Sequence, residues 1–149
     1  MALKGFRQGY FTPTHPEKYM GNADQIMYRS SWELAMNKFL DNNPHILRWS
    51  SEEIKIPYIK PTDGRQHMYF PDYWIEYVNK DGEVIQEIVE VKPLAQTRPP
   101  TTRGKKQSTI LYEQTTWAVN VEKWRAAADW CASRGIIFRV ITEKGLFKT

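Results

Sequence analysis

The sequence predicts an α/β fold with a mixed sheet flanked by helices. The main observation is the order of its segments: one helical segment, three strand-like segments, a second helical region and a final short apolar segment. Strands joined by tight turns form a meander, whereas a strand reached through a helical crossover runs parallel to its neighbour. The chain has 149 residues, close to the size of one ordinary domain. We therefore expect a single domain over residues 1–149.

The composition excludes several other classes of protein. Hydrophobic residues make up 41% of the chain and aromatic residues 13%, which favours a packed core over disorder. The single cysteine, Cys131, excludes an internal disulfide framework and a Cys-rich zinc site. No apolar run approaches the ~18 residues needed to span a bilayer, and residues 1–7 lack the apolar core of a secretion signal. We expect a soluble protein with no membrane partner.

The first helix is predicted to begin after Ser30, and residues 1–27 read as an irregular arm because they carry prolines and no sustained period. Ser30 fits the N-cap position, and Glu33, three residues later, completes the pattern of a capping box. The expected apolar stripe consists of Trp32, Ala35, Met36, Phe39 and Leu40. Pro44 disfavours helix in the residue before it, so the helix should end near that position.

Three strands are predicted next. They cover residues 49–58, 69–78 and 83–92, and the last of them is rich in β-branched residues. The turn at 79–82 contains Asp81 followed by Gly82, a pair that supplies the positive φ angles of the favoured hairpin turns. The second and third strands should therefore form a hairpin.

The rest of the chain predicts a loop, a helical region and a strand. The loop covers residues 93–107, and helical sequence begins near Ser108. Asn120 is the expected N-cap of the last helix, and Gly135 fits its C-terminal cap. The expected buried face consists of Val121, Trp124, Ala127, Ala128 and Cys131. The apolar run over residues 136–141 predicts a buried strand.

Pairing of the predicted hairpin brings three chemically active side chains together. Side chains alternate along a strand, so Glu90 and Lys92 share one face. Folding the hairpin about Asp81 places Asp72 opposite Glu90 to within one or two residues. Two carboxylates this close repel each other unless a cation lies between them, and a divalent metal is the natural candidate. Glu90 and Lys92 alone are also compatible with an exposed, solvated pair.

The positive charge of the chain is concentrated in the predicted loop. The formal net charge is +4, and residues 93–106 hold no acidic residue. The cations in this segment are Arg98, Arg103, Lys105 and Lys106. Such a run is compatible with a solvated loop and, because it begins one residue after Lys92, with contacts to the phosphates of DNA beside the site.

These features resemble the PD-(D/E)XK nuclease superfamily. The resemblance rests on Pro71-Asp72 and Glu90-Val91-Lys92 separated by a hairpin, on Glu33 in the first helix, and on the αβββαβ order of elements over residues 28–142. It implies a restriction-endonuclease-like core. Within the superfamily the chain is similar to TnsA-type endonucleases, and its length and the strings 28–40 and 49–61 are closer still to the head-completion nucleases of tailed myophages.

The resemblance implies roles for individual residues. Asp72, Glu90 and the backbone carbonyl of Val91 would hold Mg²⁺ or Mn²⁺, since these are hard oxygen donors. Glu33 would complete the metal shell, hold a second ion, or serve as a helix cap. Lys92 would orient the attacking water or neutralise charge on the phosphoryl oxygens. Arg29 and the cations of the loop are the candidates for DNA contacts.

The function expected from this resemblance is metal-dependent hydrolysis of DNA, with low sequence specificity, in phage head completion and head–tail joining. The implied partners are double-stranded DNA and portal, connector or other head-completion proteins. The implied location is the host cytoplasm during assembly, with retention in the virion left open. Two alternatives stay open: a structural head-completion or connector protein that binds DNA through a nuclease fold, and a TnsA-like transposon endonuclease subunit. The sequence leaves endonuclease and exonuclease action equally possible.

Overall fold

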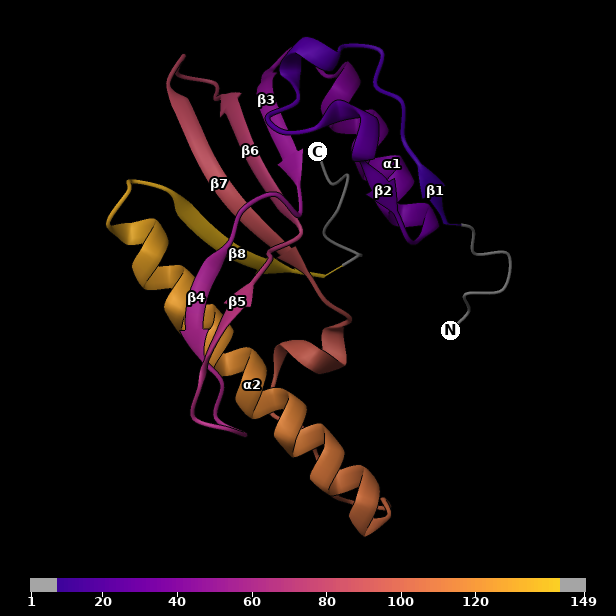
Figure 1. Cartoon of the computed structure of the whole chain (residues 1–149), viewed down its shortest axis with the longest axis vertical. Coiled ribbons are helices and arrows are strands. Elements are labelled where there is room, and N and C mark those ends of the chain that lie inside the picture. The colour runs from indigo at the N-terminus through magenta and orange to yellow at the C-terminus, as the bar shows by residue number, and fades with distance from the viewer. Residues whose placement is uncertain (1–7, 143–149) are drawn as a thin grey trace.

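The fold is built on a four-stranded sheet with a helix on each side (Figure 1). We describe it from a computed structural model, in which residues 8–142 are described. The elements before the first helix are β1 (Gly9–Tyr10), η1 (Pro16–Lys18), η2 (Ala23–Gln25) and β2 (Met27–Tyr28). The first helix is α1 (Ser31–Asn42). The elements that follow it are β3 (Ile46–Ser51), β4 (Ile56–Ile59), β5 (Gln66–Tyr69), β6 (Tyr73–Val78), β7 (Val84–Val91), η3 (Leu94–Thr97), α2 (Gln107–Ala132) and β8 (Ile137–Ile141).

The main sheet confirms the predicted α/β class and its mixed character. Its strand order is β3-β6-β7-β8. The pairs β3–β6 and β6–β7 are antiparallel, and β8 runs parallel to β7 after the crossover through α2. Tyr73 pairs with Val89, so the register of the hairpin is the one that the turn at Asp81-Gly82 predicts.

Alternation along β7 supplies both faces of the core. Val89 and Val91 pack with α1 in one apolar cluster, which also contains Leu40, Trp49 and Tyr73. Ile88 belongs to a second cluster on the opposite face. That cluster is completed by residues of α2 and of the β4–β5 hairpin, namely Ile56, Tyr58, Tyr69, Ala127 and Cys131. The polar side chains of Glu87 and Glu90 on β7 are buried as well.

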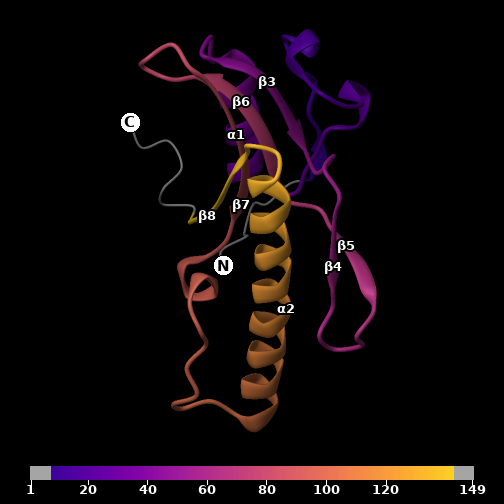
Figure 2. The same ribbon diagram turned by 90° about the vertical axis from the view of Figure 1, so that its left-hand side faces the viewer.

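Two of the three predicted strands are each divided in the structure. The segment 49–58 leaves the main sheet after Ser51, and Glu52, with a φ of 56°, turns the chain. The segment 69–78 is broken at Phe70-Pro71, because proline cannot donate to the ladder. The freed pieces, β4 and β5, form an antiparallel hairpin of their own beside α2 (Figure 2).

The last helix also differs from the prediction. Helix α2 runs without a break from Gln107 to Ala132, so Asn120 is a buried residue inside it and not an N-cap. Ala128 is exposed although it was expected on the buried face, and Phe39 of α1 is likewise exposed. In both helices the buried apolar face is narrower than the sequence pattern predicts, so these two residues lie outside it.

Part of the predicted irregular arm contributes to the core. Residues 1–7 of that arm lie outside the described residues, but from residue 8 on it holds two short strands and two 3₁₀ turns. Phe11, Tyr19 and Ile26 are buried in the cluster around Trp49. Among residues 8–142, neither helix is long and apolar enough to cross a membrane.

Candidate active site

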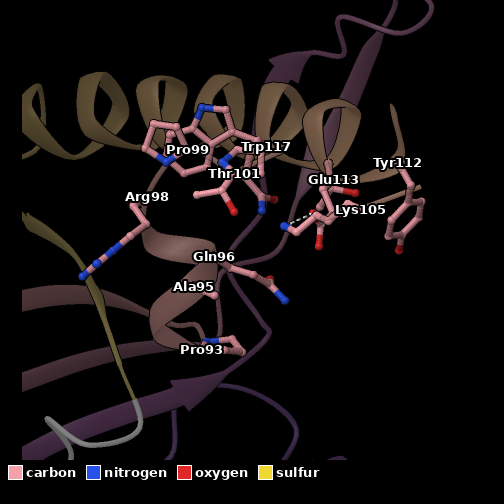
Figure 3. A pocket seen from close by; sticks show the side chains of 13 residues that line it. Pro93, Ala95, Gln96, Arg98, Pro99, Thr101, Lys105, Tyr112, Glu113 and Trp117 are labelled. Carbon is pink, nitrogen blue, oxygen red and sulfur yellow. Dashed lines mark hydrogen bonds and ion pairs between the residues drawn. The ribbon is translucent and has the colours of Figure 1, made fainter. Parts of the chain in front are cut away.

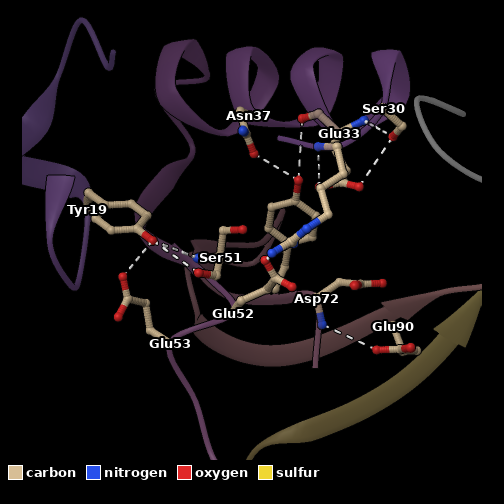
Figure 4. Close-up of polar contacts among 11 residues, drawn as sticks. Tyr19, Ser30, Glu33, Asn37, Ser51, Glu52, Glu53, Asp72 and Glu90 are labelled. Atoms are coloured by element: carbon tan, nitrogen blue, oxygen red, sulfur yellow. Dashed lines mark hydrogen bonds and ion pairs between the residues drawn. The ribbon is translucent and has the colours of Figure 1, made fainter. Parts of the chain in front are cut away.

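Asp72 and Glu90 lie side by side where β6 begins and β7 nears its end. Pro71 is fully buried and breaks the strand, so Asp72 directly precedes the first paired residue of β6. The backbone N–H of Asp72 donates to Oε1 of Glu90 at 3.2 Å, as Figure 4 shows. The structure therefore confirms the predicted juxtaposition of these two residues.

Each carboxylate is held by further hydrogen bonds. The backbone N–H of Val91 donates to Oδ2 of Asp72 at 2.8 Å, and the hydroxyl of Tyr69 donates to Oε1 of Glu90 at 2.8 Å. Oδ1 of Asp72 accepts no hydrogen bond from the described residues, and Oε2 of Glu90 faces Lys92 at 3.3 Å. Each acid is thus oriented through one oxygen, and the other faces Lys92 in Glu90 and is without a hydrogen bond from the described residues in Asp72.

The electrostatics of the pair favour a bound cation. Glu90 is 6% exposed. Burial, and next the negative charge of Glu90, raise the pKa of Asp72 to about 7. The Val91 N–H and Lys92 act in the opposite direction without offsetting these two effects. A divalent cation between the two carboxylates would remove the repulsion and favour the ionised form of Asp72.

The donor set fits a hard metal ion. Two carboxylates and the Val91 carbonyl at the end of β7 are oxygen donors of the kind that Mg²⁺ and Mn²⁺ prefer. Within residues 8–142, no group of three or more His, Cys, Asp and Glu side chains is placed to hold a metal. A cation here would therefore rest on Asp72, Glu90, backbone oxygen and water, and waters commonly remain on Mg²⁺ in proteins.

Glu33 serves as a helix cap in this arrangement. Its backbone N–H donates to Oγ of Ser30 at 3.2 Å, and its Oε1 accepts from the backbone N–H of Arg29 at 3.2 Å. The predicted capping box is thereby confirmed, in a variant that reaches one residue further back than the N-cap. The charge of Glu33 still raises the pKa of Asp72, so the two acids share one electrostatic environment.

Arg29 is paired with an acid that the sequence did not single out. Its guanidinium forms an ion pair with the carboxylate of Glu52 at 2.5 Å. Glu52 has a left-handed backbone, uncommon for a residue with a side chain, and its N–H donates to the Asp72 carbonyl at 3.1 Å. Hydrogen bonding to Glu52 raises the pKa of Arg29. The predicted DNA contact of Arg29 would require this pair to open or to turn toward DNA.

The cations of the predicted loop lie along α2 and mostly away from the two carboxylates. Figure 2 shows the segment after β7 running beside α2 to the start of that helix. Lys106 is the N-cap of α2. Lys123 of the same helix lies close enough to Glu90 and Lys92 to interact with their charges, and the 17 residues from Lys106 to Lys123 rise by ~25 Å. Arg103 and Lys106 are exposed, whereas Lys105 forms a 2.6 Å ion pair with Glu113.

A cavity lies between this loop and α2 (Figure 3). Its volume is about 390 Å³. Arg98 and Lys105 line it from the loop, and Tyr112 and Trp117 line it from the helix. The expectation that the whole loop sits beside the acids is therefore wrong for its distal half, because η3 and the long helix carry it away.

Comparison with known proteins identifies the family. The family model described as TnsA-like endonuclease N terminal matches residues 43–143. The chain belongs to the TnsA-like endonuclease family. The matched region contains Asp72, Glu90 and Lys92, and begins after α1 and Glu33. A curated protein named head completion nuclease, from Enterobacteria phage T4, is 40% identical over 144 residues, covering 93% of this chain and 92% of that protein.

These matches confirm the resemblance seen in the sequence. The matches show that the chain is a TnsA-like endonuclease and support a nuclease that acts in head completion. A nuclease implies a nucleic-acid substrate. Sequence reasoning missed three residues around the site: Tyr69, Glu52 and Lys123. Tyr69 lies on the inserted hairpin and Lys123 in a helix far along the chain. No local spacing relates either of them to Glu90.

Proposed function

We propose that this protein is a Mg²⁺- or Mn²⁺-dependent DNA nuclease of low sequence specificity that prepares packaged DNA for the joining of heads to tails. The observation that carries the proposal is the pair of half-buried Asp72 and buried Glu90, with Lys92 beside it. A DNA-binding protein without chemistry gains nothing from two adjacent carboxylates, since they repel phosphate. We therefore favour an enzyme over a structural connector protein.

Different residues of the site would have different roles in hydrolysis. Asp72, Glu90 and the Val91 carbonyl would hold the cation, and the hydrogen bonds from Val91 and Tyr69 keep the carboxylates in place before it binds. When bound, the ion would acidify a water molecule and withdraw negative charge from the phosphodiester. Lys92, 3.3 Å from Glu90, would orient that water or neutralise the developing charge on the phosphoryl oxygens. Glu33 would add negative potential from α1.

The position of the basic loop suggests a path for DNA along α2. A separation of ~25 Å along the helix matches about seven base pairs at ~3.4 Å each. Arg103 and Lys106 would then contact the backbone several base pairs from the cut, while Arg29 and Arg98 contact it nearer to the acids. Contacts of this kind carry no base readout, in keeping with low specificity. The absence of an acid in the loop favours the same path.

Cleavage of DNA by the purified chain tests the proposal. Linear and circular duplex DNA are incubated with Mg²⁺, and the assay is repeated with Asp72→Ala and Lys92→Ala. We expect cleavage by the wild type and little by either variant. Cut circles would indicate an endonuclease, and shortening of linear DNA alone an exonuclease. Absence of cleavage by the wild type, or full cleavage by both variants, contradicts the assignment.

We propose portal or connector proteins of the phage head as the protein partners of this nuclease. The site of action would be the host cytoplasm during assembly, where packaged heads are completed. This part of the proposal is supported by the nuclease family of the chain and by the name of its phage T4 relative, a head completion nuclease. Co-sedimentation of the chain with DNA-filled heads, compared with empty proheads, would test it. Binding to neither particle would contradict a role on the head itself.

A further inference from the structure

Lys123 brings a second ammonium group close to the candidate site, where its charge interacts with those of Lys92 and Glu90. It lies on α2, and its Nζ stands 5.7 Å from the ring centre of Tyr69 and 5.8 Å from that of Tyr58. Tyr69 is the residue whose hydroxyl donates to Glu90. The β4–β5 hairpin thus links the Lys123 ammonium to the carboxylate pair through a single side chain.

Lys123 differs from Lys92 in what it contacts. Lys92 forms an ion pair with Glu90, so part of its charge is already neutralised. For Lys123 the described residues supply two aromatic faces and no acid within ion-pair distance. Burial, and next the positive charge of Lys92, lower its pKa. A half-buried cation without an acidic partner gains free energy when an anion arrives.

The geometry points to Lys123 as a phosphate-binding residue that holds a DNA phosphate beside the one to be cleaved, an inference that rests on the proposed DNA nuclease function. The faces of Tyr58 and Tyr69 hold the ammonium group of Lys123 close enough to interact with the charges of Glu90 and Lys92. Substrate phosphates must approach a site that carries two carboxylates. A cation held against the Tyr69 ring would offset that repulsion and position the strand.

A purely structural lysine would behave differently. If Lys123 served only to pack on the two tyrosines, its methylene stem would carry the role and its charge would not matter to DNA. Lys123→Met keeps an unbranched stem over the rings and removes the charge. Lys123→Arg keeps the charge and the stacking. Arg125→Met removes one positive charge from the same helix, at an exposed residue paired with Glu122, and serves as the matched control.

The experiment measures DNA affinity as a function of salt in the Asp72→Asn background, where the duplex stays intact. Each phosphate contact that is lost lowers the slope of log K against log salt by ~0.9 over about 50–200 mM salt. We expect that change for Lys123→Met, a wild-type slope for Lys123→Arg, and no change for Arg125→Met. Thermal unfolding is recorded for each variant, and Lys123→Met should melt close to the background protein.

Two results would overturn the inference: an unchanged slope for Lys123→Met, or an equal change for Arg125→Met. Cleavage is followed separately with Asp72 intact, where Lys123→Met should raise KM for DNA more than it lowers kcat. Cleavage by the wild type together with an unchanged Lys123→Met slope would refute the role of Lys123 alone. No cleavage by the wild type would refute the proposed function instead.

Discussion

The hydroxyl of Tyr69 donates a 2.8 Å hydrogen bond to Oε1 of Glu90. This bond joins the β4–β5 hairpin to strand β7 of the main sheet, two residues before Lys92. Burial, and next the charge of Glu90, raise the pKa of Tyr69 well above its ordinary value, so the phenol remains a donor at any working pH. The hairpin therefore takes part in positioning a carboxylate of the site.

Replacing Tyr69 by Phe should weaken both the fold and the activity. A hydrogen bond to a charged group contributes about 1.5–3 kcal/mol, and the free energy of unfolding should fall by that order. Since a displacement of ~1 Å at a reacting group costs ~100-fold in rate, kcat should fall by roughly 10- to 100-fold. Tyr58→Phe is the control, because the Tyr58 hydroxyl contacts no carboxylate of the site. Equal kcat values for the two variants would contradict a positioning role.

Asp72→Asn should stabilise the metal-free protein at neutral and higher pH. The pKa of Asp72 is about 7 in the folded chain against an ordinary value of 3.8, so the folded state holds its proton more tightly than the unfolded state. Ionisation of Asp72 therefore lowers stability as pH rises from 3.8 to about 7. The asparagine has no such ionisation and still accepts from the Val91 N–H.

Thermal unfolding in the presence of a chelator tests whether Asp72→Asn stabilises the metal-free protein. The melting temperature of Asp72→Asn should exceed that of the wild type near pH ~8, and the gap should close toward pH ~4. Added Mg²⁺ should raise the melting temperature of the wild type and leave the variant unchanged. A variant that melts below the wild type in chelator at high pH would show that the acid pair is not repulsive.

Glu33→Gln separates the two roles of Glu33. An amide oxygen still accepts from the Arg29 N–H, so the free energy of unfolding should stay within ~0.5 kcal/mol of the wild type. Loss of the negative charge should weaken Mn²⁺ binding several-fold without abolishing it. Ser30→Ala, which removes the N-cap and keeps the charge, should instead cost about 1 kcal/mol of stability. A Glu33→Gln protein without any metal binding would make Glu33 a direct ligand.

Removing charge from the basic loop should flatten the salt dependence of DNA binding. Replacing Arg103 and Lys106 by Ala should lower the slope of log K against log salt by ~0.9 for each phosphate contact. Lys105→Ala should matter less, because its ammonium group is bound to Glu113. Lys80→Ala, at the exposed tip of the β6–β7 hairpin, is the control. An unchanged slope would mean that the loop is only solvated.

The sequence was sufficient to predict the acid pair because both partners lie on one hairpin. The Asp81-Gly82 turn sets the register, and strand alternation sets the face, so the sequence alone places Asp72 and Glu90 opposite each other. The order of helices and strands followed from the same local signals, and the capping box at Ser30 and Glu33 is equally local.

The remaining features depend on contacts that no local pattern encodes. Pro71 and the turn at Glu52 divide two apolar runs into four strands, and only packing against α2 shows where the freed pair settles. Asn120 resembles a cap in sequence but lies within α2, because the apolar residues before it continue the helix. Lys123 reaches the site only through the crossover, at a separation of 33 residues from Glu90 in the chain.

Metal binding tests the central claim, that Asp72 and Glu90 together hold the cation required for cleavage. Electron paramagnetic resonance counts bound Mn²⁺ in the wild type, in Asp72→Asn and in Glu90→Gln, all confirmed as folded by thermal unfolding. We predict that the wild type binds Mn²⁺ at a site that both variants lose, with loss of DNA cleavage in parallel. Undiminished Mn²⁺ binding in both variants would contradict the account.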